Sequence, residues 1–108
     1  MQIINHLQPS DLKKSLERLW ELSAKKILLI RKEYDVSQGS PVFTREGKYT
    51  TRGWTEWTQG FQFGGEIIQY DATGDKQFLD LGKKATMEVM APHITHTGVH
   101  DHGFNNIS

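Results

Sequence analysis

The sequence predicts an all-α fold built from paired helices. Two stretches, 10–32 and 75–90, repeat apolar residues at steps of three and four positions, as amphipathic helices do. A third helical stretch, 55–72, is separated from 75–90 by a turn short enough to set the two helices antiparallel. Paired antiparallel helices favour an array of helical hairpins or a closed toroid of them.

The first helix is expected from about Ser10 to Lys32. Ser10 or Asp11 follows Pro9 and can cap the free amides of the first turn. One side of this helix is charged and the other is apolar, so its apolar stripe requires a partner. The stripe comprises Leu12, Leu16, Leu19, Trp20, Ile27 and Ile30.

The stretch 34–52 is expected to be a long loop. Glycine and proline interrupt it, and only 42–44 and 48–51 have the composition of short extended pieces. Loops of this length in compact domains often serve a site. We interpret its small basic cluster as a solvated surface rather than a site for an anion; the cluster comprises Arg45, Lys48 and Arg52.

Glycines are unusually frequent in the second helix, which is expected over 55–72. Thr55 can cap it, and Glu56 lies in the first turn, where a negative charge is favourable. Each glycine in a helix interior costs about 1 kcal/mol relative to alanine. We therefore expect another backbone or a ligand to approach this helix closely at its glycines, Gly60, Gly64 and Gly65.

The third helix is expected to follow the turn Thr73-Gly74, with Asp75 as its cap. It should end before Pro92, because the residue preceding a proline avoids the helical conformation. The stretch 93–99 is predicted to be a loop. Asp101 or His102 then begins a fourth helix, of which the chain contains only the start.

Length and charge limit the classes of partner. The 108 residues suffice for one small domain, and 13 basic and 13 acidic residues give zero net charge. Zero net charge disfavours a general attraction to nucleic acid or to a membrane surface, so neither is an expected partner. The longest apolar run, 27–30, is too short to cross a bilayer. Cysteine is absent, which excludes disulfides and leaves the redox compartment undecided. The stretch 1–6 lacks the features of an export signal, which favours a cytoplasmic location.

An aromatic and glycine motif, Trp54-x-x-Trp57-x-x-Gly60-Phe61, lies at the start of the second helix. Aromatic faces beside glycines form a good floor for a sugar ring, because the apolar face of the ring stacks on the π surface. The alternative is that both tryptophans belong to the core and that the glycines permit tight helix packing.

The segment His100-Asp101-His102-Gly103-Phe104 places a carboxylate between two imidazoles at a helix start. Such a carboxylate can act as a general acid or base where burial and neighbouring groups tune it. The alternative is that Asp101 caps the helix and that the histidines only decorate the surface.

Four histidines lie close together in the sequence: His93, His96, His100 and His102. Imidazoles bind zinc well, so the first three are conceivable ligands. Their spacing fits no regular helical face, however, and neither cysteine nor the HExxH pattern of zinc proteases occurs. We therefore predict neither a metal nor another cofactor.

Taken together, three motifs resemble the N-terminal third of glycoside hydrolase family 88, the unsaturated glucuronyl hydrolases. They occur in the order of that family and at similar spacing: Glu56-Trp57-Thr58-Gln59-Gly60-Phe61, Tyr70-Asp71-Ala72-Thr73-Gly74-Asp75 and His100-Asp101-His102-Gly103-Phe104. The resemblance extends over about residues 10–108. It implies an (α/α)6 barrel, a toroid of about twelve helices. Residues 1–108 would be a single N-terminal fragment of it, with three helices and the start of a fourth.

The resemblance implies removal of an unsaturated uronic acid from the non-reducing end of oligosaccharides that polysaccharide lyases produce. An acid protonates the double bond, water adds, and the product rearranges with loss of the glycosidic bond, which differs from displacement at the anomeric carbon. Asp101 matches one of the family's two essential aspartates, while Trp57 matches an aromatic of the sugar subsite and His100 a site histidine. The second aspartate, the usual general acid/base, has no counterpart in this chain, so we expect the chain alone to be inactive.

Two other functions fit the same sequence. A stand-alone helical interaction module would dock a partner on the aromatic and glycine face without catalysis. A related toroidal enzyme, such as a polysaccharide lyase, would share the fold but use a different base. For an isolated fragment we also expect self-association or a molten character, because apolar faces that the rest of a toroid would cover are exposed.

Overall fold

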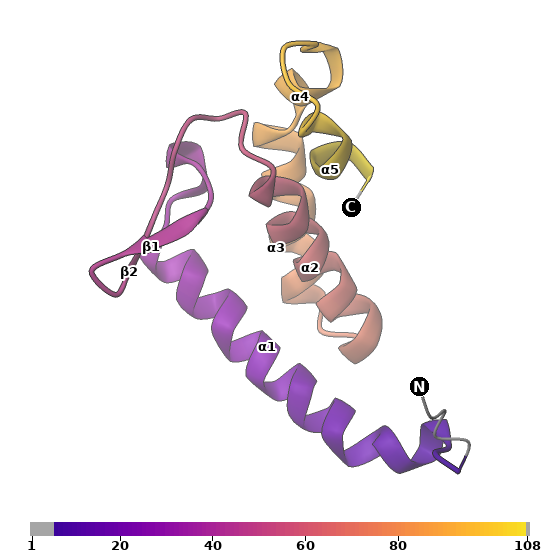
Figure 1. The fold of residues 1–108 in the computed structure, drawn as a ribbon. Helices are drawn as coiled ribbons and strands as arrows, with labels where there is room; N and C mark the ends of the chain where they lie inside the picture. Colours follow the sequence, from indigo (N-terminus) through magenta and orange to yellow (C-terminus); the bar gives the residue numbers. More distant parts are fainter. Residues whose placement is uncertain (1–5, 108) are drawn as a thin grey trace.

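The computed structural model describes residues 6–107, a helical chain with one small β-hairpin. Residues 1–5 and 108 lie outside the described residues, and with them most of the stretch 1–6 from which the expectation about export was drawn. The radius of gyration is 16.2 Å, whereas a compact chain of this length has about 13 Å. The chain is open because the N-terminal end of the first helix, α1 (Lys13–Glu33), extends away from the other helices (Figure 1).

The start of α1 differs from the prediction. A single 3-10 turn, η1 (Pro9–Leu12), precedes it. Gln8, rather than Ser10 or Asp11, occupies the capping position of this turn. The Oδ2 atom of Asp11 instead accepts a hydrogen bond of 2.9 Å from the backbone N–H of Gln8. The turn starts earlier than expected because a proline at the first position has no N–H that needs a partner.

The predicted extended pieces pair with each other, so the fold is mostly helical rather than all-α. After a 3-10 turn, η2 (Val36–Gln38), strands β1 (Phe43–Arg45) and β2 (Lys48–Thr50) form an antiparallel hairpin. Glu46 and Gly47 connect the strands with φ angles of +53° and +75°, which match the twist of a two-residue hairpin. Arg45 at the end of β1 and Lys48 at the start of β2 are both exposed, in agreement with the predicted solvated surface.

Helices α2 (Thr58–Thr73) and α3 (Lys76–Val89) form the antiparallel hairpin that the sequence predicts (Figure 1). Gly74 ends α2 in the left-handed conformation, with a φ of +73°. The side chain of Asp75 then accepts the backbone N–H of Gln77 and caps α3. The local turn chemistry therefore fixes the hairpin as expected.

The predicted start of α2 at Thr55 is wrong, because the helix begins at Thr58 without a side-chain cap. Two long side chains hold the preceding segment in a non-helical path. Gln59 donates a hydrogen bond of 3.1 Å to the carbonyl of Trp54, and Asn105 donates one of 3.0 Å to the carbonyl of Glu56. The carbonyls of Trp54 and Glu56 thus accept hydrogen bonds from side chains instead of from the backbone N–H groups of a helix.

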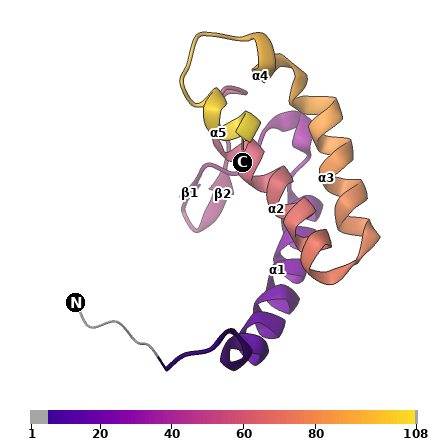
Figure 2. The ribbon, with the colours of Figure 1, turned by 90° about the vertical axis from the view of Figure 1, so that its right-hand side faces the viewer.

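Two short helices follow α3, namely α4 (Ala91–Thr95) and α5 (His102–Ile107). The predicted loop over 93–99 is therefore wrong in its first part, because residues 93–95 belong to α4. Pro92 lies in the first turn of this helix, where proline is favourable. The predicted start of a helix at His102 is confirmed. Figure 2 shows α5 against the first turns of α2, at the same end of the hairpin as α4.

Two glycines mark the closest helix contacts. A Cβ atom on Gly82 would lie 2.9 Å from the carbonyl oxygen of Phe63, and one on Gly60 would lie 2.6 Å from the Cα atom of Asn105. The predicted close approach of another backbone is therefore confirmed at Gly60, whereas Gly65 faces open space. The buried apolar residues lie along the α2–α3 hairpin: Phe63, Phe78, Ala85 and Met90.

Polar bonds join helix α1 to α2. None of the residues of α1 is buried, and Arg31 donates two hydrogen bonds of 2.6 Å to the carboxylate of Glu66. Burial raises the pKa of Glu66, and the guanidinium of Arg31 opposes that effect. The exposed leucines of this region are Leu12, Leu16, Leu19, Leu22, Leu28 and Leu29. None of the helices within residues 6–107 combines the length and the apolar character that crossing a membrane requires.

Candidate functional site

The carboxylate of Asp101 lies directly before the first turn of α5. Its Oδ1 atom is 3.3 Å from Nε2 of His100, and these side chains are 30% and 92% exposed, respectively. The backbone carbonyl of Asp101, rather than its side chain, accepts hydrogen bonds from the N–H groups of Phe104 and Asn105. Within residues 6–107 the carboxylate accepts no backbone N–H, so it is not engaged as a helix cap and remains accessible to a ligand.

Three aromatic rings gather where α5 meets the start of α2. The ring of Trp57 lies 5.5 Å from that of Phe61 and 6.2 Å from that of Phe104, in edge-to-face arrangements. These three residues, which we call the exposed aromatic cluster, are 43%, 48% and 49% exposed. Trp54 is also 48% exposed, so neither tryptophan is the core residue that the alternative interpretation required.

An open hollow of about 420 Å³ adjoins the exposed aromatic cluster. Its lining residues are His100, Gly103, Phe104 and Ile107. Phe104 contacts Trp57 and shares the hollow with His100, which in turn contacts Asp101. The structure thus brings the three predicted site residues to one end of the molecule, although Asp101 does not line the hollow itself.

A second group of side chains at this end comprises two buried histidines and one exposed histidine. We call it the histidine cluster: His93, His96 and His102. The Nδ1 atom of His102 is 2.9 Å from Nδ1 of His93, and its Nε2 atom is 2.6 Å from Nδ1 of His96. His93 and His102 are 1% and 6% exposed, whereas the side chain of His100 points into solvent and stays outside the cluster.

The histidine cluster does not have the geometry of a metal site. Its two contacts use different nitrogens of His102, so three ring nitrogens do not converge on one point as a tetrahedral ion requires. In the part of the chain that the structure describes, no group of three or more histidine or acidic side chains is arranged to hold an ion.

Gln59 and Asn105 complete the histidine cluster, and the sequence did not predict either role. The Oε1 atom of Gln59 lies 3.0 Å from Nε2 of His93. The Oδ1 atom of Asn105 accepts the backbone N–H of Gly60 at 3.0 Å, and its amide nitrogen is 3.3 Å from Nδ1 of His93. Both contacts join segments far apart in sequence, and no local pattern marks a buried amide of this kind.

Burial lowers the pKa of His93 below its usual value of 6.5, and the neighbouring His102 and His96 lower it further. The cause is that a charged imidazole loses its hydration inside the protein and is repelled by other cationic rings. A neutral His93 agrees with its contacts, since one ring nitrogen faces an amide oxygen and the other faces an amide N–H.

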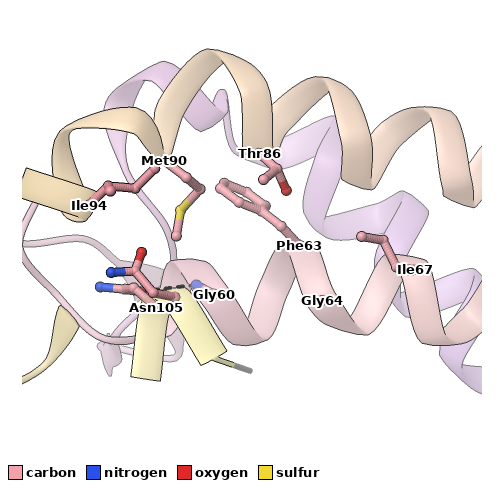
Figure 3. Close-up of a pocket in the computed structure, with 9 residues that line it drawn as sticks. Gly60, Phe63, Gly64, Ile67, Thr86, Met90, Ile94 and Asn105 are labelled. Carbon is pink, nitrogen blue, oxygen red and sulfur yellow. Dashed lines mark hydrogen bonds between the residues drawn. The ribbon is translucent and has the colours of Figure 1, made fainter. Parts of the chain in front are cut away.

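A separate cavity of about 360 Å³ opens between α2, α3 and the C-terminal helices (Figure 3). Its lining is mostly apolar, and the hydrogen bond between Gly60 and Asn105 crosses one side of it (Figure 3). None of the predicted site residues lines this cavity, and its lining contains no charged group. It therefore lacks the groups that recognition of an acidic sugar would need.

Comparison of the chain with protein-family models, with curated proteins and with solved structures found no match. The fold and the site define a mostly helical protein with an exposed aromatic cluster beside a carboxylate–imidazole pair. A functional assignment depends on this arrangement and on the sequence motifs that produce it.

Proposed function

We propose that this chain contributes part of the active site of a hydrolase that removes unsaturated uronic acid from the non-reducing end of lyase-generated oligosaccharides. The observation that carries the proposal is the connection from Trp57 through Phe104 to His100 and Asp101 at one end of the molecule. The sequence motifs that resemble family 88 contain all four of these residues. No cofactor enters the proposal.

The chemistry of hydration assigns a task to each group. A half-exposed indole such as Trp57 offers a face for stacking a sugar ring. In the proposal, Asp101 is one of the two carboxylates of the site, and the neighbouring His100 would bind a hydroxyl or the uronate. The proton adds to one carbon of the double bond and the oxygen of water to the other, and the hydrate then rearranges and releases the remaining sugar. The second carboxylate, the general acid/base, would come from outside these 108 residues.

The proposed fold is the beginning of an (α/α)6 barrel. The α2–α3 hairpin is a unit of the kind that repeats in such a toroid, and α5 would begin the next one. The open shape of the chain and its exposed apolar residues support a proposal in which further helices cover them.

The test is hydration of an unsaturated uronyl disaccharide by the polypeptide that the gene encodes, followed as loss of the ultraviolet absorbance of the double bond. We expect Asp101→Asn to abolish the reaction and the matched control Asp71→Asn, at an exposed position of α2, to leave it unchanged. Activity that persists in Asp101→Asn, or a wild-type polypeptide that neither binds nor hydrates the sugar, would overturn the proposal.

A second candidate is a helical interaction module without catalysis. The observation that favours it is α1, which buries no residue and exposes a row of leucines. A surface of this kind would promote self-association. Sedimentation of the wild type and of Leu19→Glu/Leu22→Glu distinguishes the two: concentration-dependent association that the double substitution abolishes, with no sugar binding by the wild type, would favour the module.

A further inference from the structure

A groove of about 400 Å³ lies between α1 and the turn that joins α2 to α3. Figure 1 shows this turn at the far end of the hairpin from α4 and α5, so the groove is remote from the proposed hydrolase site. We call it the acidic groove, and its lining includes Glu17, Trp20, Glu21, Gln69, Asp75 and Phe78. Its volume is within the range of ordinary small-ligand sites.

The charged side chains that line the acidic groove are all acidic among the described residues. Glu17 and Glu21 lie one helical turn apart on α1, and Asp75 is the cap of α3. Helix α2 ends at the groove, and its last turn contains no basic residue, so no side chain of that turn offsets the negative end of the helix dipole. The groove therefore favours a cation.

Gln69 adds a buried hydrogen-bond acceptor to the groove. The residue is 1% exposed, and its Nε2 atom donates a hydrogen bond of 3.1 Å to the backbone carbonyl of Trp20. This bond fixes which end of the amide faces α1. Within residues 6–107 no group donates to the other end, Oε1, although a buried acceptor without a donor is costly. A ligand that carries N–H groups would supply this donor.

Aromatic side chains give the groove an apolar surface. Phe78 and Gln69 are buried and form its floor, whereas Glu17 and Glu21 have exposed side chains and form its rim. The indole of Trp20 also lines the groove, and an indole attracts cations to its face. Methylene groups are stabilised where they cover apolar side chains. The ligand that fits this surface carries ammonium groups on an apolar chain.

The positions of the carboxylates favour an extended cation over a metal ion. In the part of the chain that the structure describes, no three acidic or histidine side chains are arranged to hold one ion. Two basic residues already contact the rim: Lys13 is 4.0 Å from Glu17, and Arg18 is 3.2 Å from Glu21. Exposed ion pairs of this kind contribute little to stability, so a multiply charged ligand can displace them.

We propose that the acidic groove binds a linear aliphatic polyamine, with its ammonium groups on the carboxylates and on Oε1 of Gln69 and its methylene groups against Trp20 and Phe78. Separate charges along a flexible chain match carboxylates that come from different helices. Since Gln69 is covered, the ligand reaches Oε1 after exposed side chains above it turn aside, a motion of picoseconds to nanoseconds. The proposal goes beyond the hydrolase, and its test involves no sugar, so either proposal can fail alone.

The experiment is a titration of the full 108-residue chain with spermidine, followed by calorimetry and by the indole N–H signals in NMR. We expect saturable binding that shifts the Trp20 signal, leaves those of Trp54 and Trp57 unchanged, and weakens as salt is added. Two compounds separate the requirements, because a linear octanediol has a chain of similar length without charge and Mg²⁺ has charge without a chain. Neither should shift the Trp20 signal at the concentration at which spermidine saturates it.

Three variants make the test specific. Glu17→Gln removes a rim carboxylate at an exposed position and should weaken spermidine binding by about 2- to 5-fold, the effect of one exposed charge pair. The matched control is Glu88→Gln, because Glu88 also lies 4.0 Å from a lysine one turn away but outside the groove; the affinity should stay unchanged. Gln69→Met keeps the length of the side chain without its acceptor and should also weaken binding. If this variant does not fold, the exposed Glu17→Gln still decides.

Four results would overturn the proposal. They are the absence of saturable spermidine binding, an equal response of the Trp20 signal to Mg²⁺, and equal losses of affinity in Glu17→Gln and Glu88→Gln. The fourth is tighter binding of an oligolysine peptide than of spermidine, which would assign the groove to a protein partner.

Discussion

The inner and outer faces of α5 are built from the same short segment but have opposite properties. On the inner face, His102 and Asn105 are buried and hydrogen-bonded to residues of α2 and α4. On the outer face, Phe104 is half exposed, and Asp101, just before the helix, has a carboxylate free of backbone bonds. The comparison separates side chains that hold the helix in place from side chains that are free to meet a ligand.

The two faces give different roles to the two histidines of the segment His100-Asp101-His102. Its two histidines flank one aspartate in sequence, yet His102 turns inward and His100 remains in solvent. Substitutions on the inner face should therefore alter mainly the free energy of unfolding, and those on the outer face should alter mainly the binding of a ligand.

The largest effect is expected from Asn105→Ala on the inner face. It removes the acceptor of the Gly60 N–H and the donor to the Glu56 carbonyl, both at 3.0 Å. Leaving buried polar groups without partners should lower the free energy of unfolding by about 2 to 4 kcal/mol in urea denaturation. The matched control is Asn106→Ala, which loses one hydrogen bond of 3.2 Å at an exposed position and should cost less than about 1 kcal/mol. Equal losses in both variants would contradict the comparison.

The next effect concerns the glycine that allows α5 to approach α2. Gly60→Ala would place a methyl group 2.6 Å from the backbone of α5 and should destabilise the chain by about 1 to 3 kcal/mol. Gly65→Ala is the control: it lies in the same helix with nothing within 4 Å, and should stabilise by up to about 1 kcal/mol. Thermal unfolding of both variants measures the difference, and two changes of the same sign would refute the close contact.

A third prediction uses the pH dependence of the inner face. Because the pKa of His93 is lowered in the folded chain, the unfolded chain takes up that proton first as the pH falls below 6.5. The stability that neutral His93 contributes is present above 6.5 and is lost as the pH falls through its folded pKa. The decline is at most about 1.4 kcal/mol per pH unit for one proton. His93→Gln keeps a donor and an acceptor and should remove this decline in urea titrations at several pH values; an unchanged acid limb would count against a neutral His93.

The smallest effect on stability is expected on the outer face. Asp101→Asn and Trp57→Ala change exposed groups outside the buried network and should shift the free energy of unfolding by no more than about 0.5 and 1 kcal/mol, respectively. Both should weaken binding of an unsaturated uronyl disaccharide, as calorimetry can measure. A loss of stability as large as that of Asn105→Ala would show that the outer face is structural.

Local chemistry explains which parts of the fold the sequence predicted. The left-handed Gly74 and the cap at Asp75 are neighbours in the chain, so the turn between α2 and α3 was foreseen. The start of α2 was misplaced, because Gln59 and Asn105 bind the preceding carbonyls from positions that no short pattern connects. The sequence predicted that Pro92 ends a helix and that a loop follows it, whereas the first turn of a new helix also accepts a proline.

In the candidate site, too, the sequence predicted what neighbouring residues determine and missed what contacts between distant residues determine. Adjacent residues such as His100 and Asp101 were predicted as members of one site, and their side chains lie 3.3 Å apart. The histidine cluster was missed, because the metal hypothesis grouped His93 and His96 with the exposed His100 instead of with His102. Which of two neighbouring histidines turns inward depends on how α5 meets α2, and that contact depends on a glycine more than forty residues away.

The most direct test of the outer face as a sugar site is an NMR titration of the three indole N–H signals with an unsaturated uronyl disaccharide. Trp20 lies on α1, Trp54 covers the histidine cluster, and Trp57 belongs to the exposed aromatic cluster, so each reports on a different part of the chain. We predict a saturable shift of the Trp57 signal with the other two unchanged, and a much weaker response to the saturated disaccharide. No shift at Trp57, or a shift confined to Trp20 or Trp54, would contradict the assignment of this surface.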